Sequence, residues 1–142
     1  LRVFRGSGDV SGILIPGNLS MATTLLGTPF MPDLRDTILL IEDVNEPPHR
    51  VDRMLFHLRN AGVLQELRAL LVGDFGTESD PLRNDALRTS LLDATQGTDY
   101  PIVCGFPFGH GPERMTLPVG VPVTFDMDRM QFTMHVPQRE LV

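Results

Sequence analysis

Residues 37–43, with the sequence TILLIED, decide the fold of this 142-residue chain. Residues 37–41 form a short continuous apolar run between turn residues, as expected for a central strand that is covered on both faces. The run stops at two acidic residues, Glu42 and Asp43. A carboxylate that emerges from a buried strand needs a partner, because burying an isolated charge is costly. We therefore expect a polar site at the carboxyl end of this strand.

Apolar patterns on either side of this strand predict further strands and helices. Buried strands are predicted at residues 11–15, 69–75 and 101–106. Apolar residues recur at helical spacing in residues 48–61 and 81–95, and a polar cap predicts a short helix over residues 21–26. From residue 37 to residue 106 the order is strand, helix, strand, helix, strand, which implies right-handed parallel crossovers.

The pattern changes after residue 110. Three short strands are predicted at residues 115–117, 122–125 and 131–136, and residues 126–129 suit a hairpin connection between the last two. An antiparallel element therefore closes the chain. The chain is long enough for one domain with a core, and its pattern and composition alone indicate a mixed α/β fold.

A second segment, GFPFGHG at residues 105–111, carries a candidate general base. Its glycines let the backbone turn sharply and leave His110 accessible at the carboxyl end of a strand, where open α/β sheets place their ligands. An imidazole can take and return the proton of a nucleophile. The alternative is that His110 is an exposed loop residue without a role in catalysis.

Glu42 is a candidate partner of His110, and Asp43 and Glu46 are competing carboxylates. A carboxylate that accepts a hydrogen bond from the imidazole fixes its tautomer and stabilises the imidazolium. Residue chemistry alone does not separate Glu42 from Asp43. Glu46 better suits the entry to the helix predicted from residue 48, where a negative charge is favourable.

No nucleophile accompanies this acid and base. None of the serines follows the strand-to-helix turn that presents a catalytic serine: Ser7, Ser11, Ser20, Ser79 and Ser90. The single cysteine, Cys104, lies inside an apolar run and is interpreted as a buried small hydrophobic residue. The chain therefore holds two parts of a catalytic triad.

Three other polar residues have two interpretations each. Asn18, which follows Pro16 and Gly17, is either a helix cap or a polar wall of the site. Arg50 and Arg53 could meet a substrate carboxylate, but solvation or pairing with nearby acids is the simpler interpretation.

Composition and spacing argue against several classes of function. A net charge of −6 without a run of basic residues argues against binding to nucleic acid or to an anionic membrane. No apolar stretch approaches the roughly 20 residues that a spanning helix needs. The remaining histidines share no metal-ligand spacing with one another or with the cysteine, so a zinc site is not expected.

Several segments, in their order and spacing, resemble the C-terminal half of the LD-carboxypeptidases, the S66 serine peptidases. The matching segments are PGNLS at residues 16–20, LGTP at 26–29, the stretch from 38 to 55, GH at 109–110 and TLPVG at 116–120. The resemblance implies a three-layer swivelling β/β/α domain with a parallel and an antiparallel sheet. It also implies that Glu42 is the catalytic acid and His110 the base. Pro16 departs from the family pattern, which usually has glycine at this position.

The resemblance further implies that residues 1–142 are a C-terminal domain. The serine of a Ser-His-Glu triad would then lie upstream, in a Gly-x-Ser-Asp turn of an N-terminal domain that this chain lacks, and the fragment alone would be inactive. The full enzyme would hydrolyse the L,D-amide bond that releases terminal D-alanine from murein tetrapeptides, in the cytoplasm and during peptidoglycan recycling. We expect Glu42 and His110 to lie within hydrogen-bond reach, and Asn18 to bind substrate.

Two other functions fit the same residues. A relative within the family would cleave peptide-nucleotide antibiotics for self-immunity, and a member of another class would be a non-catalytic swivelling domain that binds a ligand. The expected partners are the substrate, the N-terminal domain and, by resemblance, a second copy in a homodimer. Because the missing domain would cover one face, we also expect exposed apolar surface around Asn18, Pro29 and Phe108, with self-association.

Overall fold

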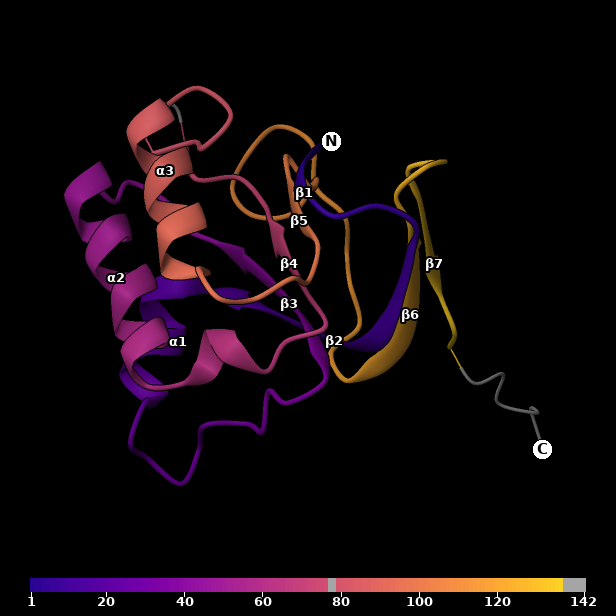
Figure 1. The fold of residues 1–142 in the computed structure, drawn as a ribbon, viewed down its shortest axis with the longest axis horizontal. Helices are drawn as coiled ribbons and strands as arrows, with labels where there is room; N and C mark the ends of the chain where they lie inside the picture. Colours follow the sequence, from indigo (N-terminus) through magenta and orange to yellow (C-terminus); the bar gives the residue numbers. More distant parts are fainter. Residues whose placement is uncertain (77–78, 137–142) are drawn as a thin grey trace.

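The computed structural model describes residues 1–76 and 79–136. Across these residues, seven strands form one sheet in the order β1-β5-β4-β3-β2-β6-β7 (Figure 1). The strands are β1 (Arg2–Arg5), β2 (Asp9–Asn18), β3 (Thr37–Glu42), β4 (Ala69–Val72), β5 (Ile102–Cys104), β6 (Val121–Asp126) and β7 (Gln131–Met134).

The sheet has a parallel centre and antiparallel edges. β3 pairs in parallel with β2 and β4, and β4 pairs in parallel with β5. β1 runs antiparallel to β5, and β6 runs antiparallel to both β2 and β7. Every residue of β3 is buried, which confirms the central strand predicted from the apolar run at residues 37–41.

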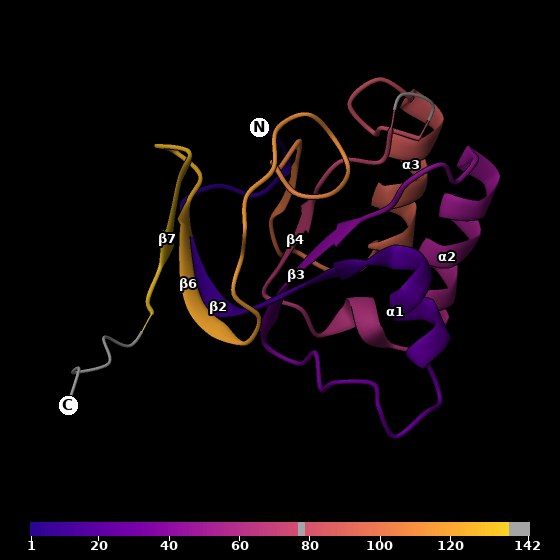
Figure 2. The same ribbon diagram turned by 180° about the vertical axis from the view of Figure 1, so that it is seen from behind.

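Helices cover one face of the parallel strands (Figures 1 and 2). They are α1 (Leu19–Leu25), α2 (Pro48–Asn60) and α3 (Asp85–Ala94), and a short 3₁₀ turn, η1 (Val63–Gln65), follows α2. α2 begins with a proline at its first position, where no backbone N–H is needed, and it is followed by Gly62 in the left-handed conformation.

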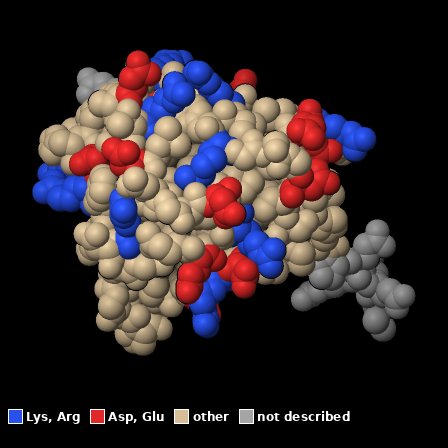
Figure 3. All heavy atoms as spheres, viewed as in Figure 1, with Lys and Arg blue, Asp and Glu red and all other residues tan. Residues whose placement is uncertain are grey.

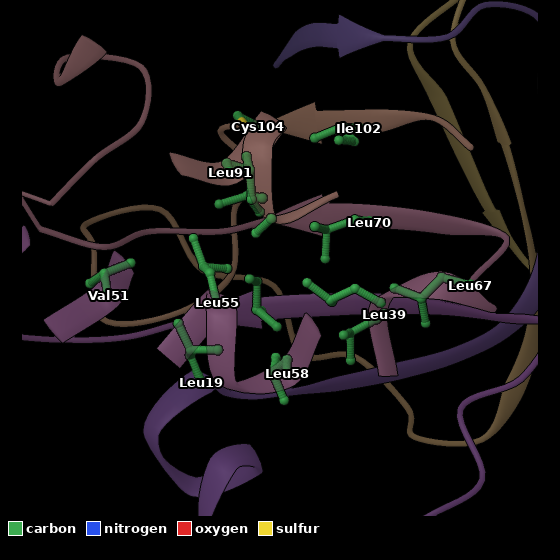
Figure 4. Close-up of a cluster of buried hydrophobic side chains, with 14 of the residues drawn as sticks. Leu19, Leu39, Val51, Leu55, Leu58, Leu67, Leu70, Leu91, Ile102 and Cys104 are labelled. Carbon is green, nitrogen blue, oxygen red and sulfur yellow. The ribbon is translucent and has the colours of Figure 1, made fainter. Parts of the chain in front are cut away.

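The helices pack on the sheet through a core of aliphatic side chains. Figure 4 shows Leu55 and Leu58 of α2 and Leu91 of α3 beside Leu39 of β3 and Leu70 of β4, and all five are buried. The helical spacing of the apolar residues in residues 48–61 and 81–95 thus forms the face that contacts the sheet.

A second core lies on the opposite face of the parallel strands. Leu40 of β3 and Val103 of β5 pack there with Val123 and Phe125 of β6. β2 joins the two parts of the sheet, because its first half pairs with β6 and its second half pairs with β3. The predicted arrangement of a helical layer, a parallel layer and an antiparallel layer is confirmed, with the two β layers continuous through one curled sheet (Figure 2).

Several predicted boundaries need correction. Residues 115–117 were predicted as a strand, and this is wrong, because no neighbouring strand pairs with them and Met115 N instead donates to Pro107 O at 2.8 Å. α3 begins at Asp85 rather than at residue 81, since Asn84 caps it by accepting hydrogen bonds from Ala86 N and Leu87 N.

β1 was not predicted from the sequence. It pairs with β5, and Arg5 fixes it by donating hydrogen bonds to Tyr100 O, Thr95 O and Thr98 Oγ1. The edge strand therefore depends on contacts with residues 90 to 95 positions away in the chain.

The surface carries both signs of charge. In the face shown in Figure 3, acidic and basic side chains alternate around uncharged areas, and neither sign forms a continuous patch. No helix among the described residues combines the length and the apolar character that crossing a bilayer requires.

Candidate active site

Glu42 and His110 form a hydrogen-bonded pair at the carboxyl end of β3. Glu42 Oε2 lies 2.8 Å from His110 Nδ1, as expected from the positions of the two residues at strand ends. The Glu42 side chain is 6% exposed, whereas that of His110 is 56% exposed. A carboxylate can only accept, so Nδ1 carries the hydrogen and Nε2 is left to exchange a proton with another molecule.

Residues 105–111 form the loop that carries His110, and hydrogen bonds tie it to the end of β4. Phe106 N donates to Val72 O at 3.0 Å, and Asp74 N donates to Phe108 O at 2.8 Å. Phe108 also packs against the second core and is only partly exposed, so it adds little to the exposed apolar surface expected around it. Hydrogen bonds therefore hold the loop against the carboxyl end of β4.

Gly109 permits the close approach of the loop to Glu42. Its φ is +122°, and a Cβ at this position would lie 2.9 Å from Glu42 Oε2. Any larger residue would collide with the carboxylate that accepts from His110. The glycine directly before the histidine is thus required by both backbone conformation and space.

Asp43 has a different set of partners from Glu42, which separates two residues that residue chemistry alone left equivalent. Its Oδ2 accepts from Ser20 N at 2.9 Å and from Ser20 Oγ at 2.7 Å, and its Oδ1 accepts from Val44 N at 2.8 Å. Asp43 therefore anchors the start of α1. Glu46, the third candidate, pairs with Arg50 at 3.4 Å.

Asn18 combines both interpretations considered for it, because it caps α1 and also contacts the acids. Its Oδ1 accepts from Met21 N at 3.0 Å, and its Nδ2 donates to Glu42 Oε1 and Asp43 Oδ1, each at 3.1 Å. Parallel pairing of β2 with β3 places Asn18 opposite Glu42. Both amide hydrogens are thus directed at carboxylates of the protein.

The remaining candidates lie outside this pair. No serine or cysteine of the described residues hydrogen-bonds to His110, and burial raises the pKa of the Cys104 thiol to about 12. The thiol is therefore neutral near pH 7 and enclosed in the core. Arg53 is exposed. Within residues 1–76 and 79–136, no group of three or more His, Cys, Asp or Glu side chains could hold a metal ion.

Comparison with known protein families gives a match over residues 11–125 to the family described as LD-carboxypeptidase C-terminal domain. The chain belongs to this family. The resemblance that the sequence motifs indicated is thereby confirmed.

Three related proteins share this LD-carboxypeptidase domain. A probable murein peptide carboxypeptidase of Bacillus subtilis is 37% identical over 116 residues, which cover 80% of this chain and 36% of the relative. The microcin C7 self-immunity protein MccF of Escherichia coli is 33% identical over 129 residues, which cover 88% of this chain and 37% of the relative. The crystal structure of muramoyltetrapeptide carboxypeptidase from Oxalobacter formigenes has a TM-score of 0.78 and 33% identity, covering 94% of this chain and 47% of that protein. The chain thus spans less than half the length of each.

Exposed apolar side chains surround a pocket beside the acids of this LD-carboxypeptidase domain. The pocket, of about 260 Å³, opens next to Asn18 and is lined mainly by apolar residues that include Met21 and Val119. Met21 is 62% exposed and Val119 68% exposed, and Phe30, which follows Pro29, is 78% exposed. The expected exposure of apolar surface near Asn18 and Pro29 is therefore confirmed.

Sequence reasoning missed Asp74 as a neighbour of the site. It lies two residues beyond the end of β4, and its carbonyl oxygen accepts from Asp43 N at 3.2 Å. A signal was present, since Asp74 follows a buried parallel strand just as Glu42 ends the neighbouring one. Acids that follow adjacent parallel strands meet at the same edge of the sheet.

Proposed function

We propose that this chain is the C-terminal domain of a serine-type LD-carboxypeptidase and that it supplies Glu42 and His110 to a Ser-His-Glu triad. The observation that carries the proposal is the 2.8 Å contact between a buried carboxylate and a half-exposed imidazole. The serine would come from an N-terminal domain, in line with the length of the relatives. The 142-residue chain alone is then inactive.

Each group has a distinct role in the proposed reaction. His110 Nε2 takes the proton of the serine hydroxyl as the serine oxygen attacks the scissile carbonyl, and Glu42 stabilises the resulting imidazolium. His110 then gives that proton to the leaving amine, and the acyl-enzyme forms. In the second half, His110 activates a water molecule, which releases the acyl group and restores the serine. No metal or cofactor takes part.

Asn18 supports this reaction through Glu42. The sequence predicts substrate binding by Asn18, but its two amide hydrogens point to Glu42 and Asp43, so its contacts favour a role in holding Glu42 in place. Because Asn18 also caps α1, it links Glu42 to the first turn of that helix. Substrate contact through Asn18 would require one of these hydrogen bonds to break.

The proposed substrate is a cytoplasmic murein tetrapeptide, from which the full enzyme releases terminal D-alanine during peptidoglycan recycling. Two of the relatives carry names for this kind of substrate, a murein peptide and a muramoyltetrapeptide. The proposed protein partners are its own N-terminal domain and a second copy in a homodimer. The exposed apolar side chains near Asn18 are suited to such contacts.

The second candidate is cleavage of a peptide-nucleotide antibiotic for self-immunity. The observation that favours it is the 33% identity to the microcin C7 self-immunity protein. The acid and base would be the same in both reactions, so the two candidates differ only in what the active site accepts.

A substrate comparison tests which function applies. The full-length protein is given, in parallel, a murein tetrapeptide ending in L,D-linked D-alanine and an aminoacyl sulfamoyl nucleotide, and the product of each is measured by mass spectrometry. We expect D-alanine release with a kcat/KM at least tenfold above that for the nucleotide. The reverse preference would favour the self-immunity reaction, and no turnover of either would favour a non-catalytic binding domain.

A further inference from the structure

Asp74 connects the strand that carries Glu42 to the loop that carries His110. Its carbonyl oxygen accepts a hydrogen bond from Asp43 N at 3.2 Å, and its N–H donates to Phe108 O at 2.8 Å. The peptide groups on either side of Asp74 therefore join the two halves of the candidate site. A change in the position of this residue would move one half relative to the other.

The Asp74 side chain packs against the residue that follows His110. Asp74 Oδ1 accepts from Gly76 N at 2.9 Å, which fixes the orientation of the carboxylate. The other oxygen, Oδ2, faces Gly111, where an added Cβ would lie 2.5 Å from Oδ2 and 3.1 Å from Cγ. No described residue donates a hydrogen bond to Oδ2. The contact between Asp74 and the loop is therefore one of packing.

The residue that precedes His110 is held from the other side. A Cβ at Gly109 would lie 2.9 Å from Glu42 Oε2 and 3.2 Å from Asp74 O. The two glycines that flank His110 thus each pack against an acidic residue, Gly109 against Glu42 and Gly111 against Asp74. This double support fixes the stretch of chain from which the imidazole projects.

We propose that Asp74 is a positioning residue, whose carboxylate holds the loop so that His110 Nδ1 stays on Glu42 Oε2. This inference rests on the proposed role of His110 in the reaction. The shape of the side chain matters here, because Oδ2 packs on the backbone of Gly111 and forms no ion pair with any residue that the structure describes. Misplacement of a general base by about 1 Å can lower a rate about 100-fold, and residues that hydrogen-bond to metal-bound histidines contribute about 10- to 100-fold to affinity or activity.

Two substitutions separate the functions of the two carboxylate oxygens. Asp74→Asn keeps the shape of the side chain and the acceptor for Gly76 N. Asp74→Ser keeps an acceptor for the turn but removes Oδ2, the atom of Asp74 nearest to the Gly111 position. Asp126→Ala is the matched control, because Asp126 Oδ1 accepts from Arg129 N at 2.8 Å in the hairpin between β6 and β7, away from His110.

The first readout is the tautomer of His110, measured by ¹⁵N NMR of the imidazole in the 142-residue chain and assigned by its loss in His110→Gln. The wild type, Asp74→Asn and Asp126→Ala should all show the Nδ1–H form as the main neutral tautomer. In Asp74→Ser the ratio of Nδ1–H to Nε2–H should fall at least threefold. An unchanged ratio in Asp74→Ser would overturn the proposal.

A double-mutant cycle tests the contact itself. Gly111→Ala should lower the tautomer ratio in the wild-type background, where the new methyl group meets Asp74 Oδ2. In the Asp74→Ser background the same change should have less than half that effect, because Oδ2, the atom 2.5 Å from the new methyl group, is gone. Equal effects in the two backgrounds would show that the contact does not position the loop.

Activity gives an independent readout. In the full-length protein, Asp74→Ser should lower kcat about 10- to 100-fold with KM changed less than about threefold, and Asp74→Asn should stay within about threefold of wild type. The NMR measurements need no substrate, so an inactive full-length protein would contradict the proposed function alone. A normal kcat in Asp74→Ser would contradict the role of Asp74.

Discussion

Glu42→Gln is the substitution whose effect follows most directly from the geometry. It keeps the size of the side chain and a hydrogen-bond acceptor but removes the negative charge beside His110. A neutral imidazole can still donate from Nδ1 to the amide oxygen, but the amide NH2 group then faces Asn18 Nδ2, which loses its acceptor on this side chain. What is lost is stabilisation of the imidazolium that forms during the reaction.

The contact distance and the exposure of the two side chains set the magnitude. An imidazolium and a carboxylate 2.8 Å apart interact by about 6 kcal/mol at an effective dielectric constant of about 20, and by about 1.5 kcal/mol in bulk water. Glu42 is 6% exposed but His110 is 56% exposed, so a value between these limits, about 3 to 4 kcal/mol, is appropriate. Glu42→Gln should then lower kcat by about 10²- to 10³-fold.

The assay is steady-state D-alanine release by the full-length protein, with kcat and KM determined separately. KM should change less than about threefold, because the lost interaction develops in the transition state. Glu46→Gln is the matched control, since Glu46 pairs with Arg50 and not with His110, and its kcat should stay within about twofold of wild type. A Glu42→Gln enzyme within threefold of wild type would refute the assignment of the acid.

Three further predictions concern Gly109, the Cys104 thiol and the exposed apolar surface that includes Phe30. Gly109→Ala puts a methyl group 2.9 Å from Glu42 Oε2 at a φ of +122°, so it should reduce activity and lower the free energy of unfolding, measured by urea denaturation, by about 1 to 3 kcal/mol. Gly120→Ala is the control, because nothing lies within 4 Å of a Cβ at that position, and its effect should be smaller. Equal effects of the two substitutions would contradict this prediction. Burial raises the pKa of the Cys104 thiol to about 12, so this thiol loses its proton at a lower pH in the unfolded chain than in the folded one. The free energy of unfolding should therefore fall as the pH rises from about 9 to 12, and the fall should be shallower in Cys104→Ala. Light scattering should show self-association that Phe30→Asp weakens, and a strictly monomeric wild-type chain would count against an interface at this surface.

The central part of the fold was predictable because its signal is local. The run from Ile38 to Ile41 is apolar throughout, and such a short run is typical of a strand that is covered on both faces. β1 gave no such signal, since Arg2–Arg5 has no apolar alternation and is held by residues from the far end of the domain. Residues 115–117 gave a false strand signal, because a segment with β propensity does not form a strand without a pairing partner.

The site was predictable in position but not in detail. Strand ends predict where polar residues gather, and this placed Glu42 near His110. Neighbouring residues along an extended chain point to opposite faces, so Glu42 and Asp43 meet different partners. Glu42 faces the loop that carries His110, and Asp43 faces the start of α1, and the sequence does not show which face each of these elements covers. Asp74 was missed for the same reason, since its packing on Gly111 depends on how the loop folds back over β4.

The most direct test of the central claim is D-alanine release from murein tetrapeptide by three proteins, the full-length enzyme, its His110→Ala variant and the 142-residue chain. We predict release by the full-length enzyme, a decrease of at least about 1000-fold in His110→Ala, and none by the chain, because the proposed triad takes its base from this chain and its serine from another domain. Wild-type release by His110→Ala, or release by the chain alone, would contradict a triad divided between two domains.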